Sequence, residues 1–119
     1  MSVLLKAVFT VFVSIHGLIH LLGFAKEWRL SDSTQVSGKT LFHIGEGASK
    51  AMGVLWLLAC LIFLASASAY ALKIEWWWMI VAVGLIVSQT LIVIYWVDAK
   101  FGTIANIIIF TAIILSLWA

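Results

Sequence analysis

Residues 3–24, VLLKAVFTVFVSIHGLIHLLGF, decide the fold class because they form a nearly unbroken apolar run. A helix needs roughly 20 apolar residues, at a rise of about 1.5 Å each, to cross the hydrocarbon core of a bilayer. We therefore expect a retained membrane span, since no small-residue cleavage site precedes the polar segment that starts at Lys26. His16 and His20 lie inside this span, where ionisable side chains are rare without a reason.

The composition of the whole chain leads to the same class. Of its 119 residues, 65% are hydrophobic and 10% are charged, and the mean hydropathy is +1.19, whereas soluble domains are about 25% charged. No linker-like stretch divides the chain, so residues 1–119 are predicted to form a single domain. The net charge of +2 is spread over loops, which argues against nucleic acid as a partner. The lone Cys60 excludes a disulfide within one chain.

Four apolar segments predict an all-α integral membrane protein with four antiparallel transmembrane helices in an up-down bundle. The expected spans are residues 3–25, 41–72, 75–97 and 102–118. The loop after the first span is long and the other two connections are short, which is typical of up-down bundles. Six of the seven tryptophans fall near the predicted ends, where an indole suits the membrane interface, and Trp56 alone lies mid-span.

The basic residues predict the orientation of these spans. The first and third loops contain more Lys and Arg than the opposite side, namely Lys26, Arg29, Lys39 and Lys100 against Lys6 and Lys73. Because cytoplasmic loops are enriched in basic residues, we expect both termini to lie on the non-cytoplasmic side.

Polar side chains gather toward one membrane face. At about 100° per residue, the first span presents a single polar stripe, made by His16, His20, Gly23 and Glu27. The start of the second span presents another stripe, made by Lys39, His43, Glu46 and Lys50. The remaining spans add polar groups near the same face, among them Ser88, Tyr95, Asp98, Thr103 and Asn106. The opposite half of the bundle has few such groups, so we expect a polar site near the cytoplasmic face.

The metal hypothesis follows from the spacing of His16 and His20. Histidines at i and i+4 project from one helix face and are able to reach one ion. The predicted ligands are His16, His20, His43 and Glu46, with Glu27, Lys50, Tyr95, Asp98 and Asn106 as supporting polar groups. Imidazole and carboxylate ligands suit Zn, Fe, Mn or Cu(II), and a single bis-histidine haem would join the first span to His43.

Three alternatives use the same residues without a bound metal. The histidines could donate to carbonyls or to Ser and Asn side chains of neighbouring helices, at about 1 kcal/mol each. An oligomeric transporter or channel could use them to move protons or ions. An accessory subunit of a larger membrane complex would need them only for packing. No catalytic residue or reaction follows from the sequence, so enzymatic activity stays open.

One segment has a family resemblance. Residues 96–106, Trp96-Val97-Asp98-Ala99-Lys100-Phe101-Gly102-Thr103-Ile104-Ala105-Asn106, together with the histidine-containing first span, resemble small bacterial four-helix membrane proteins. The resemblance implies a multi-pass protein of the bacterial inner membrane and implies no particular activity.

Overall fold

The computed structural model describes residues 3–28, 40 and 45–118, except for the side chain of Glu46. The described segments are helical and contain no strand. Three helical stretches are long and apolar enough to cross a membrane, namely Val3–Glu27, Gly47–Ala71 and Trp77–Ile94. A fourth apolar helix, Gly102–Trp118, is shorter. The prediction of an all-helical protein with membrane-type helices is confirmed to this extent.

The first apolar run forms two helices, α1 (Val3–Ile19) and α2 (Leu21–Glu27), which meet at His20. The backbone N–H of His20 donates to the carbonyl of Gly17 at 3.0 Å, so the helix tightens here to an i→i−3 bond. The carbonyl of His16, the usual i−4 acceptor, instead accepts from the His20 side chain at 2.7 Å. This competition between side chain and backbone interrupts the span that the sequence predicts to be continuous.

The other helices are α3 (Glu46–Ala71), α4 (Trp77–Ile94), α5 (Trp96–Ala99) and α6 (Gly102–Trp118). Lys73, in the turn between α3 and α4, has a positive φ of 62°. The predicted third span contains a second interruption, because Tyr95 leaves helical geometry with φ −103° and ψ 38°. Tyr95 therefore sits at a corner between α4 and the short α5.

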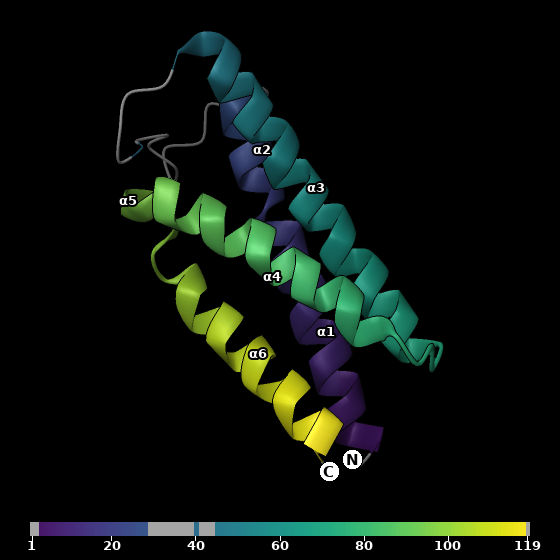
Figure 1. Ribbon diagram of the computed structural model, residues 1–119. Helices are drawn as coiled ribbons and strands as arrows, with labels where there is room; N and C mark the ends of the chain where they lie inside the picture. The colour runs from purple at the N-terminus through teal and green to yellow at the C-terminus, as the bar shows by residue number, and fades with distance from the viewer. Residues whose placement is uncertain (1–2, 29–39, 41–44, 119) are drawn as a thin grey trace.

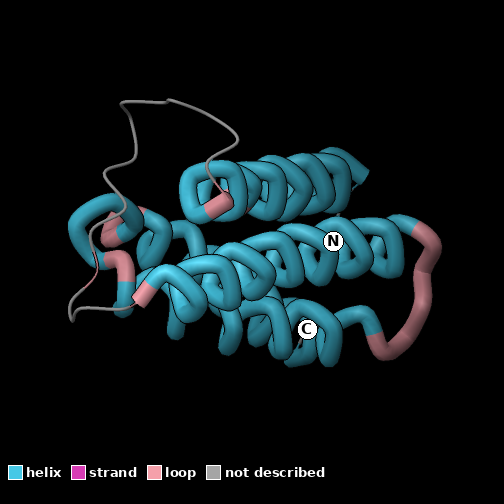
Figure 2. Tube along the Cα trace, turned by 90° about the horizontal axis from the view of Figure 1, so that it is seen from above, coloured by secondary structure: helices cyan, strands magenta, loops and turns pink. Residues whose placement is uncertain are grey.

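Helix α3 is the central element of the packing. It lies against α1 and α2 on one side and against α4 on another, while α6 packs mainly on α4. In Figure 1, α4 crosses α1 obliquely, and the two chain ends lie at the same end of the molecule. Figure 2, turned by 90° from this view, shows the long helices side by side, with the α3–α4 turn at one end. The molecule measures 45 × 22 × 22 Å, and its long axis matches a bilayer with its headgroups, about 40–45 Å.

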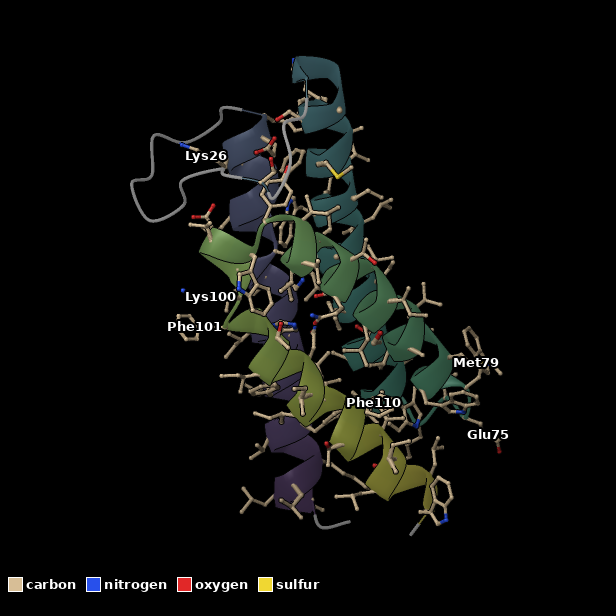
Figure 3. The ribbon with its side chains drawn as sticks, turned by 60° about the vertical axis from the view of Figure 1, so that its left-hand side comes forward. Lys26, Glu75, Met79, Lys100, Phe101 and Phe110 are labelled. Atoms are coloured by element: carbon tan, nitrogen blue, oxygen red, sulfur yellow. The ribbon has the colours of Figure 1, made fainter. Side chains whose placement is uncertain are left out.

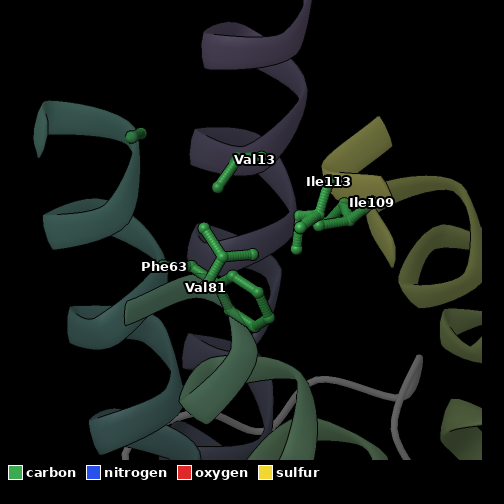
Figure 4. Close-up of a cluster of buried hydrophobic side chains, with 6 residues drawn as sticks. Val13, Phe63, Val81, Ile109 and Ile113 are labelled. Carbon is green, nitrogen blue, oxygen red and sulfur yellow. The ribbon is translucent and has the colours of Figure 1, made fainter. Parts of the chain in front are cut away.

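Two apolar clusters fill the interior. The first joins α1, α3, α4 and α6 through Val13, Phe63, Ala67, Val81, Ile109 and Ile113, and Figure 4 shows Phe63 and Val81 facing the α6 isoleucines. The second cluster lies nearer α2 and α5 and contains Trp56, Ala59, Leu91, Ile92 and Tyr95. The polar side chains described below lie between these two clusters.

Small residues let α1 and α2 approach α3 closely. A Cβ added at Gly17 would lie 2.8 Å from the Cβ of Phe63 and 3.2 Å from the carbonyl oxygen of Cys60. A Cβ added at Gly23 would lie 2.4 Å from the Trp56 ring. The absence of a side chain at Gly23 thus allows the Trp56 indole to contact α2 directly.

The outward faces of the helices are apolar. Many large aliphatic and aromatic side chains are exposed, and Figure 3 shows Met79, Phe101 and Phe110 projecting from the surface. Such a surface is expected of a protein surrounded by lipid, because in water it would greatly exceed the usual size of an apolar patch.

Candidate functional site

The two histidines of the first run are buried, with 6% of His16 and 3% of His20 exposed. His16 Nε2 lies 2.7 Å from Asn106 Oδ1 on α6, and His20 Nε2 lies 2.8 Å from Ser88 Oγ on α4. Their rings contact each other edge to face, with centroids 4.8 Å apart. The bonds of these histidines to Ser and Asn of neighbouring helices, which one of the alternatives predicts, are therefore present.

Asn106 connects the histidines to further polar groups. Its Nδ2 donates to Ser88 Oγ at 3.1 Å and to Gln89 Oε1 at 3.0 Å. Gln89 Nε2 in turn donates to Thr103 Oγ1 at 3.1 Å. The resulting network joins α1, α4 and α6 and consists of His16, His20, Ser88, Gln89, Thr103 and Asn106.

The proton positions in this network follow from the acceptors. A carbonyl oxygen only accepts, so His20 Nδ1 donates to His16 O, and in a neutral imidazole His20 Nε2 then accepts from the Ser88 hydroxyl. The amide oxygen of Asn106 likewise accepts from His16 Nε2. These bonds are compatible with a neutral form of each histidine. A hydrogen-bonded network without net charge is what an apolar surrounding tolerates best.

These bonds limit how a metal could bind. An ion bound by both histidines would have to replace the hydrogen bond between His20 Nε2 and Ser88, because the other ring nitrogen of His20 already donates to a carbonyl. Among the residues that the structure describes, no group of three or more His, Cys, Asp or Glu side chains comes together. His43 lies outside the described residues, and so does the side chain of Glu46. The four-ligand metal or haem site stays a prediction.

A cavity of about 350 Å³ lies beside the network. Its wall has contributions from α1 to α6 and from the corner at Tyr95, and it includes His16, Gly23, Glu27, Trp56, Tyr95 and Ala105. Two side chains in this wall bury a hydrogen-bonding atom that has no partner among the described residues, Trp56 Nε1 and Tyr95 Oη. Only 6% of Trp56 and 2% of Tyr95 is exposed. Unpaired buried donors are costly, so these two atoms are the exceptional feature of the site.

Aromatic packing holds both side chains in place. The rings of Trp56 and Tyr95 meet edge to face, with centroids 5.4 Å apart. The Trp56 ring also contacts the His20 ring, at 5.4 Å between centroids. The position of the indole is thus determined by Gly23 on one side and by His20 and Tyr95 on others.

Charged side chains lie at the α2 and α5 end of the cavity, namely Lys26, Glu27 and Asp98. Glu27 accepts a hydrogen bond from Ser49 of α3, which ties the end of α2 to α3. Lys50, predicted as a supporting group, lies outside the cavity wall, with its ammonium 5.1 Å from the Trp28 ring centroid.

The structure brings together most of the described residues that the sequence predicted for the site. His16 and His20 meet Asn106, while Glu27, Tyr95 and Asp98 line the adjacent cavity. Gln89 and Trp56 were not predicted for the site, and Ser88 was predicted to lie near the polar face but was given no role in the site. Ser88 and Gln89 interrupt an otherwise apolar span, and Trp56 is the tryptophan farthest from the interfaces, so each had a signal in the sequence.

Comparison with known proteins adds no family to this description, since no family, curated protein or solved structure matches the chain.

Proposed function

We propose that this chain is a multi-pass membrane protein that binds a small lipid-soluble molecule in the cavity between α2, α3 and α6. The observation that supports it is a cavity of about 350 Å³ whose wall holds two buried hydrogen-bonding atoms without partners. Ligand sites of small molecules are largely apolar, have volumes of about 300–1,000 Å³ and contain a few placed polar groups. The cavity has each of these properties.

The hydrogen-bond network supports this function by holding the helices that form the cavity. His16 belongs both to the network and to the cavity wall, and Asn106 follows Ala105 of that wall on α6. Polar bonds between helices in lipid contribute about 0.6 kcal/mol on average. Several of them together favour one rotation of each helix, and so a constant cavity shape.

A cavity-filling substitution tests the proposal. We expect octane, a purely apolar probe, to raise the melting temperature of the detergent-purified wild type, because ligands that bind only the folded state stabilise it. Ala105→Phe places a ring in the cavity. We expect this variant to need an octane concentration at least about tenfold higher for the same stabilisation. The measurement is thermal unfolding over a series of octane concentrations.

The matched control is Ala112→Phe, two turns further along α6 and outside the cavity wall. It should respond to octane as the wild type does. An Ala105→Phe protein that is stabilised as strongly as the wild type would show that octane acts elsewhere, for example on the detergent.

We also propose that α1 with α2, α3, α4 with α5, and α6 form four antiparallel spans with both termini on the non-cytoplasmic side of a bacterial inner membrane. In a Cys60→Ala background, Lys100→Cys is expected to react with a membrane-impermeant maleimide only from the cytoplasmic face. Lys73→Cys is expected to react only from the opposite face. Labelling of both cysteines from one side would contradict four antiparallel spans, and labelling with the faces exchanged would reverse the orientation.

A further inference from the structure

The chemistry of the cavity wall indicates what kind of molecule it receives, an inference that rests on the proposed function. We infer that the ligand is a neutral, lipid-soluble compound whose polar end is a carbonyl or hydroxyl oxygen that accepts from Trp56 Nε1 and Tyr95 Oη.

The unpaired atoms define the first requirement. An indole N–H is a donor only, and a phenol is a donor as well as an acceptor. Neither Trp56 Nε1 nor Tyr95 Oη makes a hydrogen bond of normal geometry among the described residues, although the Tyr95 hydroxyl lies near Glu27 and the Trp56 indole, and both residues belong to the cavity wall. One oxygen with two lone pairs is able to accept from both donors, so the ligand must supply an acceptor atom.

The charges near the cavity define the second requirement. Two carboxylates and one ammonium line it, from Glu27, Asp98 and Lys26. An anionic head group would be desolvated beside two like charges, which disfavours it. An ammonium head group would find carboxylates, but it has no lone pair to offer the Trp56 N–H. A neutral oxygen satisfies the donors without bringing a charge into an apolar wall.

The apolar remainder of the wall defines the third requirement. Ile19, Leu22, Ile92 and Phe101 contribute to it together with Ala105. The hydrocarbon part of a ligand would bury its surface against these side chains. Removing apolar surface from water contributes about 25 cal/mol of favourable free energy per Å². Such a molecule partitions into the bilayer, in which the exposed apolar surface of the protein is expected to lie.

The experiment compares compounds that share one hydrocarbon body and differ in the head group: octane, hexyl methyl ketone, octanol, octylamine and octanoate. Apparent affinities come from thermal stabilisation of the purified full-length protein. We expect the ketone and the alcohol to bind the wild type about three- to tenfold more tightly than octane, since one or two hydrogen bonds of typical strength are gained. The amine and the carboxylate should gain no such advantage.

Two conservative substitutions test the donors. Tyr95→Phe and Trp56→Phe each remove one hydrogen-bonding atom while keeping a ring, and each should reduce the advantage of the ketone and the alcohol over octane by about threefold or more. Tyr70→Phe, at the far end of α3 in an aromatic cluster with Phe9 and Trp77, makes the same chemical change outside the cavity and should leave the advantage intact. In the absence of ligand, Tyr95→Phe should change the melting temperature little, because its hydroxyl makes no hydrogen bond of normal geometry among the described residues.

The outcomes separate the two proposals. If octane and the oxygenated compounds all fail to stabilise the wild type, the binding function itself is wrong. If all five compounds bind equally well, or if Tyr95→Phe and Trp56→Phe leave the ketone advantage unchanged, the cavity binds ligands but the inferred head group is wrong. A preference for octanol over the ketone would identify a hydroxyl that also donates, and the reverse would identify a carbonyl.

Discussion

Replacing Asn106 with alanine is expected to lower the free energy of unfolding by about 2–3 kcal/mol. Asn106 accepts from His16 and donates to Ser88 and Gln89, so its loss leaves three groups without this partner. A buried group left unsatisfied costs about 1–3 kcal/mol in soluble proteins, whereas interhelical bonds in membranes average about 0.6 kcal/mol. Three losses of about 0.6–1 kcal/mol each, from the membrane average to the lower value for soluble proteins, give the expected effect. Reversible unfolding in mixed detergent micelles measures it.

A substitution on the outer side of the same helix is the control. Thr111→Ala removes an exposed hydroxyl from α6 and should change stability by no more than about 0.5 kcal/mol. A double-mutant cycle then isolates the bond itself. His16→Phe combined with Asn106→Ala should cost less than the sum of the single changes by at least about 0.5 kcal/mol. Strict additivity would mean that His16 and Asn106 do not interact.

The second large effect is expected at Gly17, where alanine should destabilise the protein by about 1–3 kcal/mol. The added methyl group would lie 2.8 Å from Phe63 Cβ and 3.2 Å from the carbonyl oxygen of Cys60. Both atoms are part of α3 or fixed directly to it, so the contact is relieved only if α1 moves away from α3. That movement would loosen the cluster around Phe63, which is fully buried.

Gly47 offers a matched glycine near the start of α3, where an added Cβ has no atom within 4 Å. Gly47→Ala should therefore not destabilise the protein, and the higher helix propensity of alanine should add up to about 1 kcal/mol. The same micelle unfolding assay compares the two variants. An equal change at both positions would mean that the close approach of α1 to α3 does not determine the effect at Gly17.

The helices and their membrane character follow from local sequence. Each long helix is an apolar run of sufficient length, and the connection around Lys73 is a short polar interruption. The grouping of polar residues could also be predicted, because helical periodicity places His16 and His20 on one face. The interruptions at His20 and Tyr95 could not, since they depend on side-chain bonds and packing that no hydropathy pattern contains.

The sequence by itself determined the all-helical class, the apolar segments and the face of the first helix on which the histidines lie. Tertiary structure alone decided their partners: His16 bonds to a residue 90 positions later in the chain, and His20 to one on another helix. It also decided that Trp56 and Tyr95 share a cavity wall. Partner choice depends on the rotation and crossing of each helix, which arise from the packing of all helices together. Periodicity along one segment contains no information about that packing.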